Sequence, residues 1–425
     1  MRHTTYTIPP PTYTHGLHWE YKPDSMWQHS HSYRIHSIPR QSIYTSPDSI
    51  THQLYQADNL LCLHHLLNNK VNIDMIYIDP PYNTGNKKNQ EGFVYHDKRK
   101  GTTFTYAHSD WLNFMYPRLY LAKQLLTKHG LIFISIDENE FAHLKLLCDM
   151  IFGESQFMNF MVWKKRGTGG QVKDGSIISQ TEFILIYAKN KKFAKLNKIP
   201  NQEVGKVKWR DFRKSGGQWQ REYRPKQFFP IYYNPKDQSL SLEPSSKLDL
   251  KILPQNAKGE DGFWENGVET TLQRLKAGEL KAKLTKSNQL KVYQKEVAKE
   301  GMNAGNLIDI PSVQGSHEIK QFDLQFNNVK PLSLLQYLLQ IGSNSDATIL
   351  DFFAGSGSTA HAVFKLNDST STRRKIITCN NNESNIFQHI TLPRIQRAIN
   401  GYVNSNGKKI DPLPNVNLDV FSIEN

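Results

Sequence analysis

The stretch IYIDPPYNTG, residues 76–85, places a single carboxylate between an apolar β-branched run and two consecutive prolines. Proline at 80 pushes Asp79 towards extended geometry, and the two prolines fix the backbone that follows. Because Pro80 has no N–H, its surroundings are rich in acceptors and poor in donors. The corner therefore presents a carboxylate, carbonyl oxygens and the ring of Tyr82, a set that suits an exocyclic amino group on a flat ring.

An amine bound at this corner would donate its N–H groups to the Asp79 side chain and the Pro80 carbonyl, while Tyr82 stacks on the ring. An adenine amine is a poor nucleophile because its lone pair is delocalised into the ring. Acceptors on its protons favour a pyramidal nitrogen and help to remove a proton as a methyl group arrives. The reaction therefore depends more on positioning the amine than on a strong base. A plain structural turn is the alternative interpretation.

A second motif, LDFFAGSGSTAHAV (350–363), ends a β-rich run at Gly355 and Gly357, before a helix. Glycine lets a ligand approach the backbone and lets the chain turn sharply. These residues also match the dinucleotide-binding pattern G-x-G-x-x-A, with Ala360 in the final position, which would indicate an NAD-dependent oxidoreductase. However, the nearest candidate for the ribose carboxylate, Glu383, lies beyond the usual spacing of about 20 residues. Such an enzyme also gives no role to Asp-Pro-Pro-Tyr.

The pattern of apolar residues predicts the elements that hold the two motifs. Helical spacing occurs at 58–69, 111–130, 138–153 and 329–342. Strand-like apolar runs occur at 71–79, 131–137, 159–165, 181–189 and 375–379, and strand–turn–helix text occurs at 347–364. This alternation predicts an α/β fold, with a doubly wound, mostly parallel Rossmann-like sheet that is interrupted by an insert.

The charge of the chain is concentrated in that insert. The net charge is +14, and residues 191–305 contain 24 Lys and Arg against 13 Asp and Glu, so they carry +11 of it. Aromatic residues alternate with the basic ones at 207–233, and helical text returns at 270–284. Basic side chains can hold phosphates and flat ones can stack on bases, so the insert is a candidate nucleic-acid module. A solvated basic surface is the alternative.

The remaining segments are less informative. We expect an N-terminal arm of loops at 1–44 and a C-terminal tail at 403–425, on either side of a domain whose two halves lie at 45–190 and 306–402. Seven histidines between His3 and His52 show no metal-ligand spacing, and no metal is expected. Three distant cysteines indicate a reducing compartment, and no run of 18 apolar residues occurs, so we expect a cytoplasmic protein without a membrane span.

The motifs DPPYNTG and DFFAGSGSTAHAV resemble the catalytic and cofactor motifs of amino-methyltransferases that use S-adenosylmethionine. Their order, with an insert between them, resembles the beta class of DNA methyltransferases. The stretches ADNLLCLHHLL, FISIDENEFAHLKLLCDMIFG and TLPRIQRAINGY are similar to the modification (Mod) subunit of Type III restriction–modification systems. The resemblance covers roughly 54–190 and 306–402.

This resemblance implies methyl transfer from S-adenosylmethionine to adenine N6 in double-stranded DNA, with the insert as target-recognition module. Relatives that act on cytosine N4 more often begin the first motif with Ser, so cytosine N4 is the alternative within the family. A catalytically decayed DNA-binding protein is the alternative that is not an enzyme. The resemblance also implies a homodimer and a restriction (Res) subunit as partners, whereas the target sequence cannot be read from the chain.

The resemblance assigns roles to individual residues. The base-amine pocket corresponds to Asp79, Pro80, Pro81 and Tyr82. The cofactor site corresponds to Asp351, to Phe353 packing on the cofactor, to Gly355 and Gly357 admitting its methionine part, to Lys330-Pro331 closing the pocket, and to Asp58 near the adenine. Many relatives place a ribose-binding carboxylate where Cys379-Asn380 stands here, so Glu383 is the substitute candidate.

Overall fold

The structure is a computed structural model that describes residues 2–8, 17, 19, 27–84, 104–167, 177–200, 204–285, 289–298 and 300–424. The chain divides into two compact units. Unit 1 comprises Met1–Lys198 and Asn303–Asn425, and unit 2 comprises Ile199–Met302. Unit 2 lies within the insert expected at 191–305. None of the helices in the described ranges is long and apolar enough to cross a membrane.

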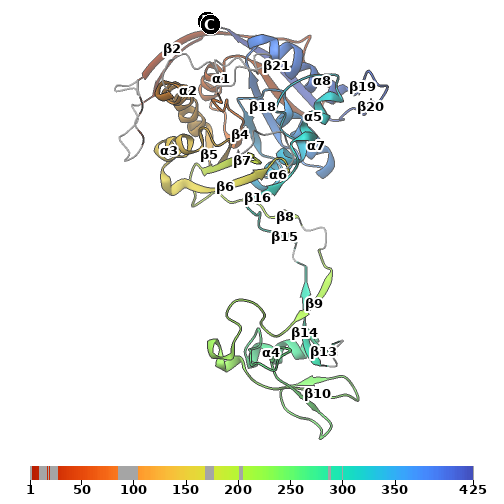
Figure 1. The fold of residues 1–425 in the computed structure, drawn as a ribbon. Coiled ribbons are helices and arrows are strands. Elements are labelled where there is room, and N and C mark those ends of the chain that lie inside the picture. The colour runs from red at the N-terminus through yellow and green to blue at the C-terminus, as the bar shows by residue number, and fades with distance from the viewer. Residues whose placement is uncertain are drawn as a thin grey trace. The chain divides into compact units, whose positions relative to one another are not determined.

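Unit 1 is built on one large mixed sheet (Figure 1). Its strands follow the order β1 (Arg2–Ile8), β2 (Trp27–Ser37), β21 (Val416–Glu424), β3 (Ile50–Gln56), β18 (Lys375–Asn380), β17 (Thr348–Asp351), β4 (Ile73–Ile78), β5 (Leu126–Ile136), β7 (Thr181–Ala188), β6 (Phe157–Lys164) and β16 (Leu307–Asp309). The six strands from β21 to β5 in this order are parallel to one another. By contrast, β2 is antiparallel to β21, and β7 is antiparallel to both β5 and β6. The predicted mostly parallel α/β sheet is therefore confirmed.

Helices cover both faces of this sheet, which explains why its central strands are apolar on both sides. On one face lie α1 (Asn59–Asn68), α2 (Phe104–Leu125) and α3 (Phe141–Phe152), each packed on the next (Figure 1). On the other lie α6 (Leu332–Gly342), α7 (Ser358–Thr370) and α8 (Leu392–Asn400), with α5 (Val313–Lys320) against α6 (Figure 1). A short hairpin, β19 (Tyr402–Val403) and β20 (Lys409–Ile410), follows α8.

The two sequence motifs leave neighbouring strands. β4 pairs in parallel with β17, with Met75 opposite Ile349 and Ile76 opposite Leu350. From β17 the chain proceeds through α7 to β18 on one side, and from β4 it proceeds through α2 to β5 on the other. The carboxyl ends of β4 and β17 therefore flank a topological switch point, where open α/β sheets bind their ligands.

Two helix boundaries differ from the sequence-based expectation. The helix expected at 111–130 ends at Leu125, and β5 begins at Leu126, because Leu126 pairs with Ile73 of β4. The helical text at 270–284 contains α4 (Val268–Lys276) and then β13 (Leu280–Leu284), separated by Gly278 in the left-handed region at φ 65°. In both places pairing with another strand outweighs the local helical spacing.

Described residues at both ends of the chain form strands of the large sheet, whereas loops or a loosely docked arm were expected at 1–44. Within 1–44, β1 pairs antiparallel with β2, and β2 pairs antiparallel with β21. The expected C-terminal tail supplies β21, which lies between β2 and β3 in the sheet. β1 and β2 lack strong apolar alternation, whereas β21 shows it at Val416, Leu418 and Val420. The pairing of β2 with β21 joins opposite ends of the chain, a contact that local periodicity cannot reveal.

Unit 2 contains small sheets around its own core. The sheets are β13–β14–β9, with β14 (Leu290–Val297) and β9 (Val207–Asp211), and β11–β10–β12, with β11 (Leu240–Ser241), β10 (Ile231–Tyr233) and β12 (Leu250–Ile252). A two-stranded ladder, β8 (Ile199–Pro200) with β15 (Gly301–Met302), lies where the chain enters and leaves the unit. The core contains Phe212 stacked on Trp264 with ring centroids 5.4 Å apart, together with Ile231, Ile252, Leu280 and Val292.

Candidate active site

The corner that follows β4 holds Asp79 in a tight polar cluster. The Lys330 ammonium lies 2.8 Å from Asp79 Oδ1 and 2.7 Å from Oδ2. The Tyr82 hydroxyl donates to Asp79 Oδ1 at 2.7 Å and lies 3.0 Å from Lys330 Nζ. The cofactor-closing residue expected at 330 therefore contacts the catalytic motif directly.

Glu182 is a second carboxylate in this cluster, and sequence reasoning missed it. It lies near the start of β7, accepts from Tyr82 at 3.1 Å and lies 3.4 Å from Lys330 Nζ. Lys165 also pairs with it at 2.9 Å. A carboxylate in an otherwise apolar strand, TEFILIYA, was the available signal, because a buried charge needs a partner. We call Asp79, Tyr82, Glu182 and Lys330 the catalytic cluster, after the catalytic role that the sequence predicts for Asp79 and Tyr82.

Burial and charge determine which of these groups are ionised. Burial raises the pKa of Asp79, and the Lys330 charge opposes this shift. Burial also pushes the pKa of Glu182 upward, but Lys330 and Lys165 together hold it below its ordinary value. Burial lowers the pKa of Lys330, but the charges of Asp79 and Glu182 raise it above its ordinary value. The ammonium thus remains charged at neutral pH and favours the acceptor form of both carboxylates.

The cluster leaves Asp79 able to accept another hydrogen bond. Within the described ranges, Oδ1 takes bonds from Lys330 and Tyr82, whereas Oδ2 takes one from Lys330. A carboxylate oxygen has two lone pairs, so Oδ2 can accept an N–H from a ligand without losing Lys330. The Asp79 side chain is 27% exposed, whereas that of Lys330 is 7% exposed, so a ligand can reach the carboxylate.

Neighbouring helices brace the rest of the motif. Trp111 of α2 donates its indole N–H to the Pro81 carbonyl at 2.7 Å. Asn83 lies in the left-handed region at φ 56°, and its amide donates to Glu140 at 2.5 Å. These contacts fix the backbone that flanks Tyr82, and the two prolines restrict the backbone that precedes it. Gly85 lies outside the described residues.

The glycine loop after β17 adopts the conformation that its residue types predict. Gly355 and Gly357 lie in the left-handed region at φ 49° and 77°. A Cβ atom on Gly357 would lie 3.1 Å from Ile395 of α8, whereas the nearest atom to one on Gly355 would be 3.8 Å away. Gly357 is therefore required by packing and conformation, and Gly355 by conformation alone.

Aromatic and acidic residues line the start of this loop. Phe353 is 7% exposed, and its ring centroid lies 6.0 Å from that of Phe114 in α2. Asp351 accepts from the Phe353 backbone N–H at 3.0 Å. Burial raises the pKa of Asp351 to about 7, while hydrogen bonds from Thr359 and the Phe353 backbone oppose this shift.

Asp351→Asn should change how stability depends on pH. The folded protein binds the Asp351 proton more tightly than the unfolded chain, because the pKa rises from 3.8 to about 7. The wild type should therefore lose stability relative to the variant as pH rises through this window, by at most about 1.4 kcal/mol per pH unit. Urea unfolding at several pH values measures the difference. The exposed Asp368→Asn serves as control, and a pH-independent difference for Asp351→Asn would contradict the assignment.

The other expected cofactor residues lie at strand and helix ends. Asp58 caps α1 by accepting from the Leu60 N–H, and its carboxylate lies 3.3 Å from Arg118. Pro331 immediately precedes α6. Glu383 opens a short 3₁₀ segment after β18 and is half-buried.

Asn380, at the end of β18, stands where a ribose-binding carboxylate would be expected, and its side chain makes different contacts. The Asn380 amide donates to the Gly355 carbonyl at 3.2 Å and to the Thr391 hydroxyl at 2.9 Å. The Thr391 hydroxyl also donates to the Gly355 carbonyl, at 2.6 Å. Asn380 therefore holds the glycine loop in place.

Unit 2 presents a basic and aromatic surface on one face of β13–β14–β9. Cross-strand pairing places Lys281 opposite Tyr293 and Lys295 opposite Trp209. Side chains alternate along strands, so the core residues lie on one face of the sheet. The other face carries Trp209, Asp211, Lys281, Lys283, Lys291, Tyr293 and Lys295. The Lys281 ammonium lies 3.6 Å from the centroid of the Trp209 ring. We call this surface the lysine face.

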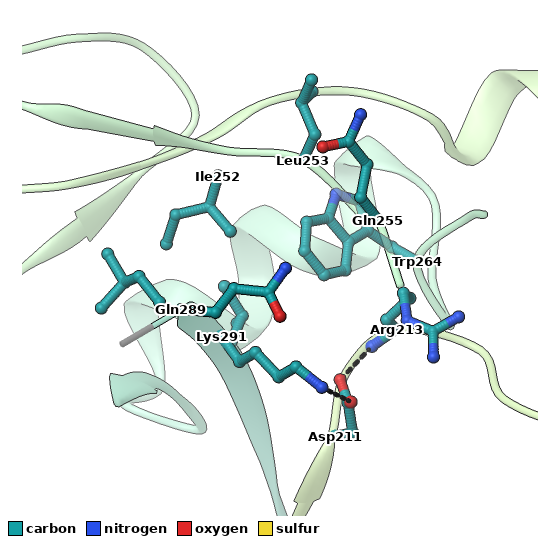
Figure 2. A pocket seen from close by; sticks show the side chains of 10 residues that line it. Asp211, Arg213, Ile252, Leu253, Gln255, Trp264, Gln289 and Lys291 are labelled. Carbon is teal, nitrogen blue, oxygen red and sulfur yellow. Dashed lines mark hydrogen bonds and ion pairs between the residues drawn. The ribbon is translucent and has the colours of Figure 1, made fainter. Parts of the chain in front are cut away.

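A pocket beside this sheet is lined by polar groups that already bind one another (Figure 2). Asp211 pairs with Lys291 at 3.7 Å and accepts from the Arg213 backbone N–H at 3.0 Å (Figure 2). The Trp264 indole, which also lines the pocket, donates to the Phe229 carbonyl at 2.8 Å. These bonds stabilise the fold of unit 2, so we assign the pocket no ligand.

Comparison with known proteins gives consistent relatives. The family model for DNA methylases matches residues 73–386. The Type II methyltransferase M.KpnI of Klebsiella pneumoniae is 34% identical over 360 residues, covering 81% of this chain and 84% of that protein. The Type III EcoPI Mod subunit of Escherichia phage P1 is 34% identical over 386 residues, covering 76% of this chain and 56% of that protein.

Coverage differs between these relatives. The chain spans between 52% and 58% of the length of three Type III Mod subunits that it matches at 32–35% identity. Among solved structures, the PvuII DNA methyltransferase (cytosine-N4-specific) is similar with a TM-score of 0.42 and 10% identity, covering 84% of this chain and 89% of that one.

Proposed function

We propose that this chain, which belongs to the DNA methylase family, transfers a methyl group from S-adenosylmethionine to adenine N6 in double-stranded DNA. It would act as the modification enzyme of a restriction–modification system. The observation that supports the proposal most strongly is the catalytic cluster, in which Lys330 and Tyr82 hold Asp79 at the end of β4. The glycine loop follows the neighbouring strand, so donor and acceptor sites are adjacent.

The catalytic cluster suits an attack by a neutral amine. S-adenosylmethionine supplies a methyl group on a positively charged sulfur. Asp79 Oδ2 accepts one amine N–H and so holds the nitrogen lone pair towards the glycine loop. Tyr82 stacks on the base once it leaves the duplex. As the N–C bond forms, the bond between the methyl carbon and sulfur would break, and its electron pair would return to the sulfur, so that neutral S-adenosylhomocysteine leaves. The amine nitrogen would become positively charged, and the Asp79 carboxylate would stabilise that charge until the extra proton leaves to water.

Adenine is favoured over cytosine because the motif begins with Asp79, and cytosine N4 remains the second candidate. Methyl transfer from radiolabelled S-adenosylmethionine to DNA tests the enzyme assignment, and calorimetry tests the cofactor. Binding of S-adenosylmethionine without transfer to any DNA would favour a decayed DNA-binding protein. Binding of NAD in its place would refute the proposal.

Tyr82 should act through its ring and its hydroxyl separately. Tyr82→Ala should weaken the complex with target DNA by roughly 1–3 kcal/mol, because a stacked base loses its platform. Tyr82→Phe should retain that affinity but turn over more slowly, because it lacks the hydroxyl that donates to Asp79. Titration of DNA containing the target site, combined with single-turnover rates, distinguishes the two effects. If the wild type and Tyr82→Ala bind the DNA with equal affinity, the target base does not stack on Tyr82.

DNA recognition is assigned to unit 2, and within it to the lysine face. Unit 2 contains 20 Lys and Arg against 13 Asp and Glu. The lysine face is opposite the core and carries four ammonium groups and two aromatic rings. Lys291 pairs with Asp211 at 3.7 Å. We therefore propose Lys281, Lys283 and Lys295 as the phosphate ligands, while the aromatic rings can stack on bases. By contrast, Arg210 and Lys214 both pair with Glu265, at 3.4 and 3.9 Å, so they are less available to bind phosphates.

The triple variant Lys281→Gln, Lys283→Gln and Lys295→Gln should reduce DNA affinity and its dependence on salt. Each phosphate contact contributes about 0.9 to the slope of log K against log salt, so the slope should fall by up to about 2.7. Affinity for S-adenosylmethionine should stay unchanged, because the expected cofactor residues belong to unit 1. Fluorescence anisotropy at four salt concentrations measures the slope.

A matched control removes the same charge elsewhere in unit 2. The exposed residues Lys236, Lys247 and Lys258 lie outside the lysine face. Their triple substitution by Gln should change DNA affinity much less than the lysine-face variant. If both triple variants lose the same affinity, general positive charge, and not the lysine face, binds the DNA.

Partners follow from the relatives. The Type III assignment implies a homodimer and a restriction subunit as partners. The 34% identity to M.KpnI supports a Type II methyltransferase as the second candidate. Light scattering of the protein alone measures the oligomeric state. Co-purification with a co-expressed restriction subunit from the same operon would favour the Type III system.

A further inference from the structure

Two histidines and one carboxylate converge next to the catalytic corner. Glu140 is the N-cap residue of α3, His143 lies within the first turn of that helix, and His108 lies in α2. His108 Nδ1 is 2.7 Å from Glu140 Oε1, and His143 Nδ1 is 2.9 Å from Glu140 Oε2. One potential ligand atom of each residue lies within 4.8 Å of those of the others.

The burial of Glu140 requires a compensating charge. Its side chain is fully buried, whereas those of His108 and His143 are 29% and 33% exposed. A buried carboxylate without a cation is costly. Within the described ranges, no lysine or arginine forms an ion pair with Glu140. The site therefore provides one buried carboxylate, two imidazole nitrogens and access from solvent.

One contact of the cluster is poorly aligned for a hydrogen bond. His143 Nδ1 lies 2.9 Å from Glu140 Oε2, but the two atoms do not meet the angular requirement for a hydrogen bond. Lone pairs that point at a common ion give this arrangement, because ligands face the ion and not each other. Ligands about 2.1 Å from a tetrahedral ion lie about 3.4 Å apart. The side chains would need to separate by less than about 1 Å to reach that spacing.

We propose that His108, Glu140 and His143 bind one divalent transition-metal ion of the zinc type, with a fourth position open to water. Two imidazoles and a carboxylate suit such an ion, and a Glu-x-x-His spacing brings both ligands to one side of a helix turn. The site is separate from the methyl-transfer chemistry and touches it through Asn83, whose amide donates to Glu140. The ion anchors the end of the catalytic corner to α2 and α3.

Metal binding can be measured without activity. Protein freed of metal by a chelator should take up one equivalent of Co²⁺, with the visible absorption of a four-coordinate site. It should also remove one equivalent of Zn²⁺ from a chromophoric chelator. The double variant His108→Ala and His143→Ala should bind Zn²⁺ at least about 100-fold more weakly, since changes outside the ligand set alone often cost 10–100-fold. Zinc should raise the Tm of the wild type and leave that of the double variant unchanged.

The exposed His317→Ala in α5 is the control and should bind zinc as the wild type does. Circular dichroism confirms that the variants fold, and His143→Ala alone replaces the double variant if that one does not. A wild-type protein that takes up no equivalent of either ion would overturn the proposal. So would a folded ligand variant that binds zinc with wild-type affinity. In both cases the three side chains form a hydrogen-bonding cluster that positions Asn83.

Discussion

Asp79→Ala should lower the rate of methyl transfer about 10²–10³-fold, the usual cost of removing one such transition-state interaction. The variant lacks the acceptor that orients the amine and stabilises its positive charge. Affinity for S-adenosylmethionine should remain close to that of the wild type, because the glycine loop follows β17 and not β4. Single-turnover kinetics with saturating cofactor separate the chemical step from binding.

Two further substitutions sharpen this test. Asp79→Asn retains an oxygen acceptor but loses the charge that pairs with Lys330, so it should be slower than wild type and faster than Asp79→Ala. Asp110→Ala removes an exposed carboxylate from α2 and should leave the rate unchanged. Turnover of Asp79→Ala at the wild-type rate would mean that this corner does not hold the reacting amine.

Lys330→Met should destabilise the fold by about 3–5 kcal/mol, the range for breaking a buried ion pair by removing one partner. Asp79 and Glu182 would then face each other without the ammonium that lies 2.7 and 3.4 Å from them. The loss should be largest at neutral pH. It should shrink as the pH falls and the carboxylates take up protons, because Lys330 stabilises only their charged forms.

A double variant distinguishes unpaired charge from lost packing. Lys330→Met combined with Glu182→Gln removes one of the stranded carboxylates, so it should recover part of the stability that Lys330→Met loses. Urea unfolding at pH 5 and pH 8 measures both effects. If the loss in Lys330→Met is the same at the two pH values and Glu182→Gln restores nothing, Lys330 acts by packing and does not balance the two carboxylates.

The sequence predicted the elements that carry the two motifs because their signals are local. β4 and β17 are short apolar runs that end at a motif, and Gly355 and Gly357 have the positive φ angles that glycine tolerates. Parallel pairing of β4 with β17 then follows from the alternation of strands and helices. The doubly wound core could therefore be predicted from residue patterns alone.

Features that depend on contacts distant in sequence could not be predicted. Lys330 and Asp79 are 251 residues apart, and Tyr82 and Glu182 are 100 residues apart, so spacing gave no indication that they meet. β21 comes from the C-terminal part of the sequence but lies in the sheet between β2 and β3, which come from the N-terminal part. The side of β13–β14–β9 that carries the lysines depends on strand register, which composition does not determine.

We propose that the catalytic cluster directs methyl transfer to an adenine amine in DNA. The most direct test uses S-adenosylmethionine with a deuterated methyl group, incubates it with duplex DNA and the protein, and digests the product to nucleosides for mass spectrometry. We predict labelled N6-methyladenine with the wild type and about 10²–10³-fold less with Asp79→Ala. Label in N4-methylcytosine alone, or in no nucleoside from any DNA tested, would contradict the claim.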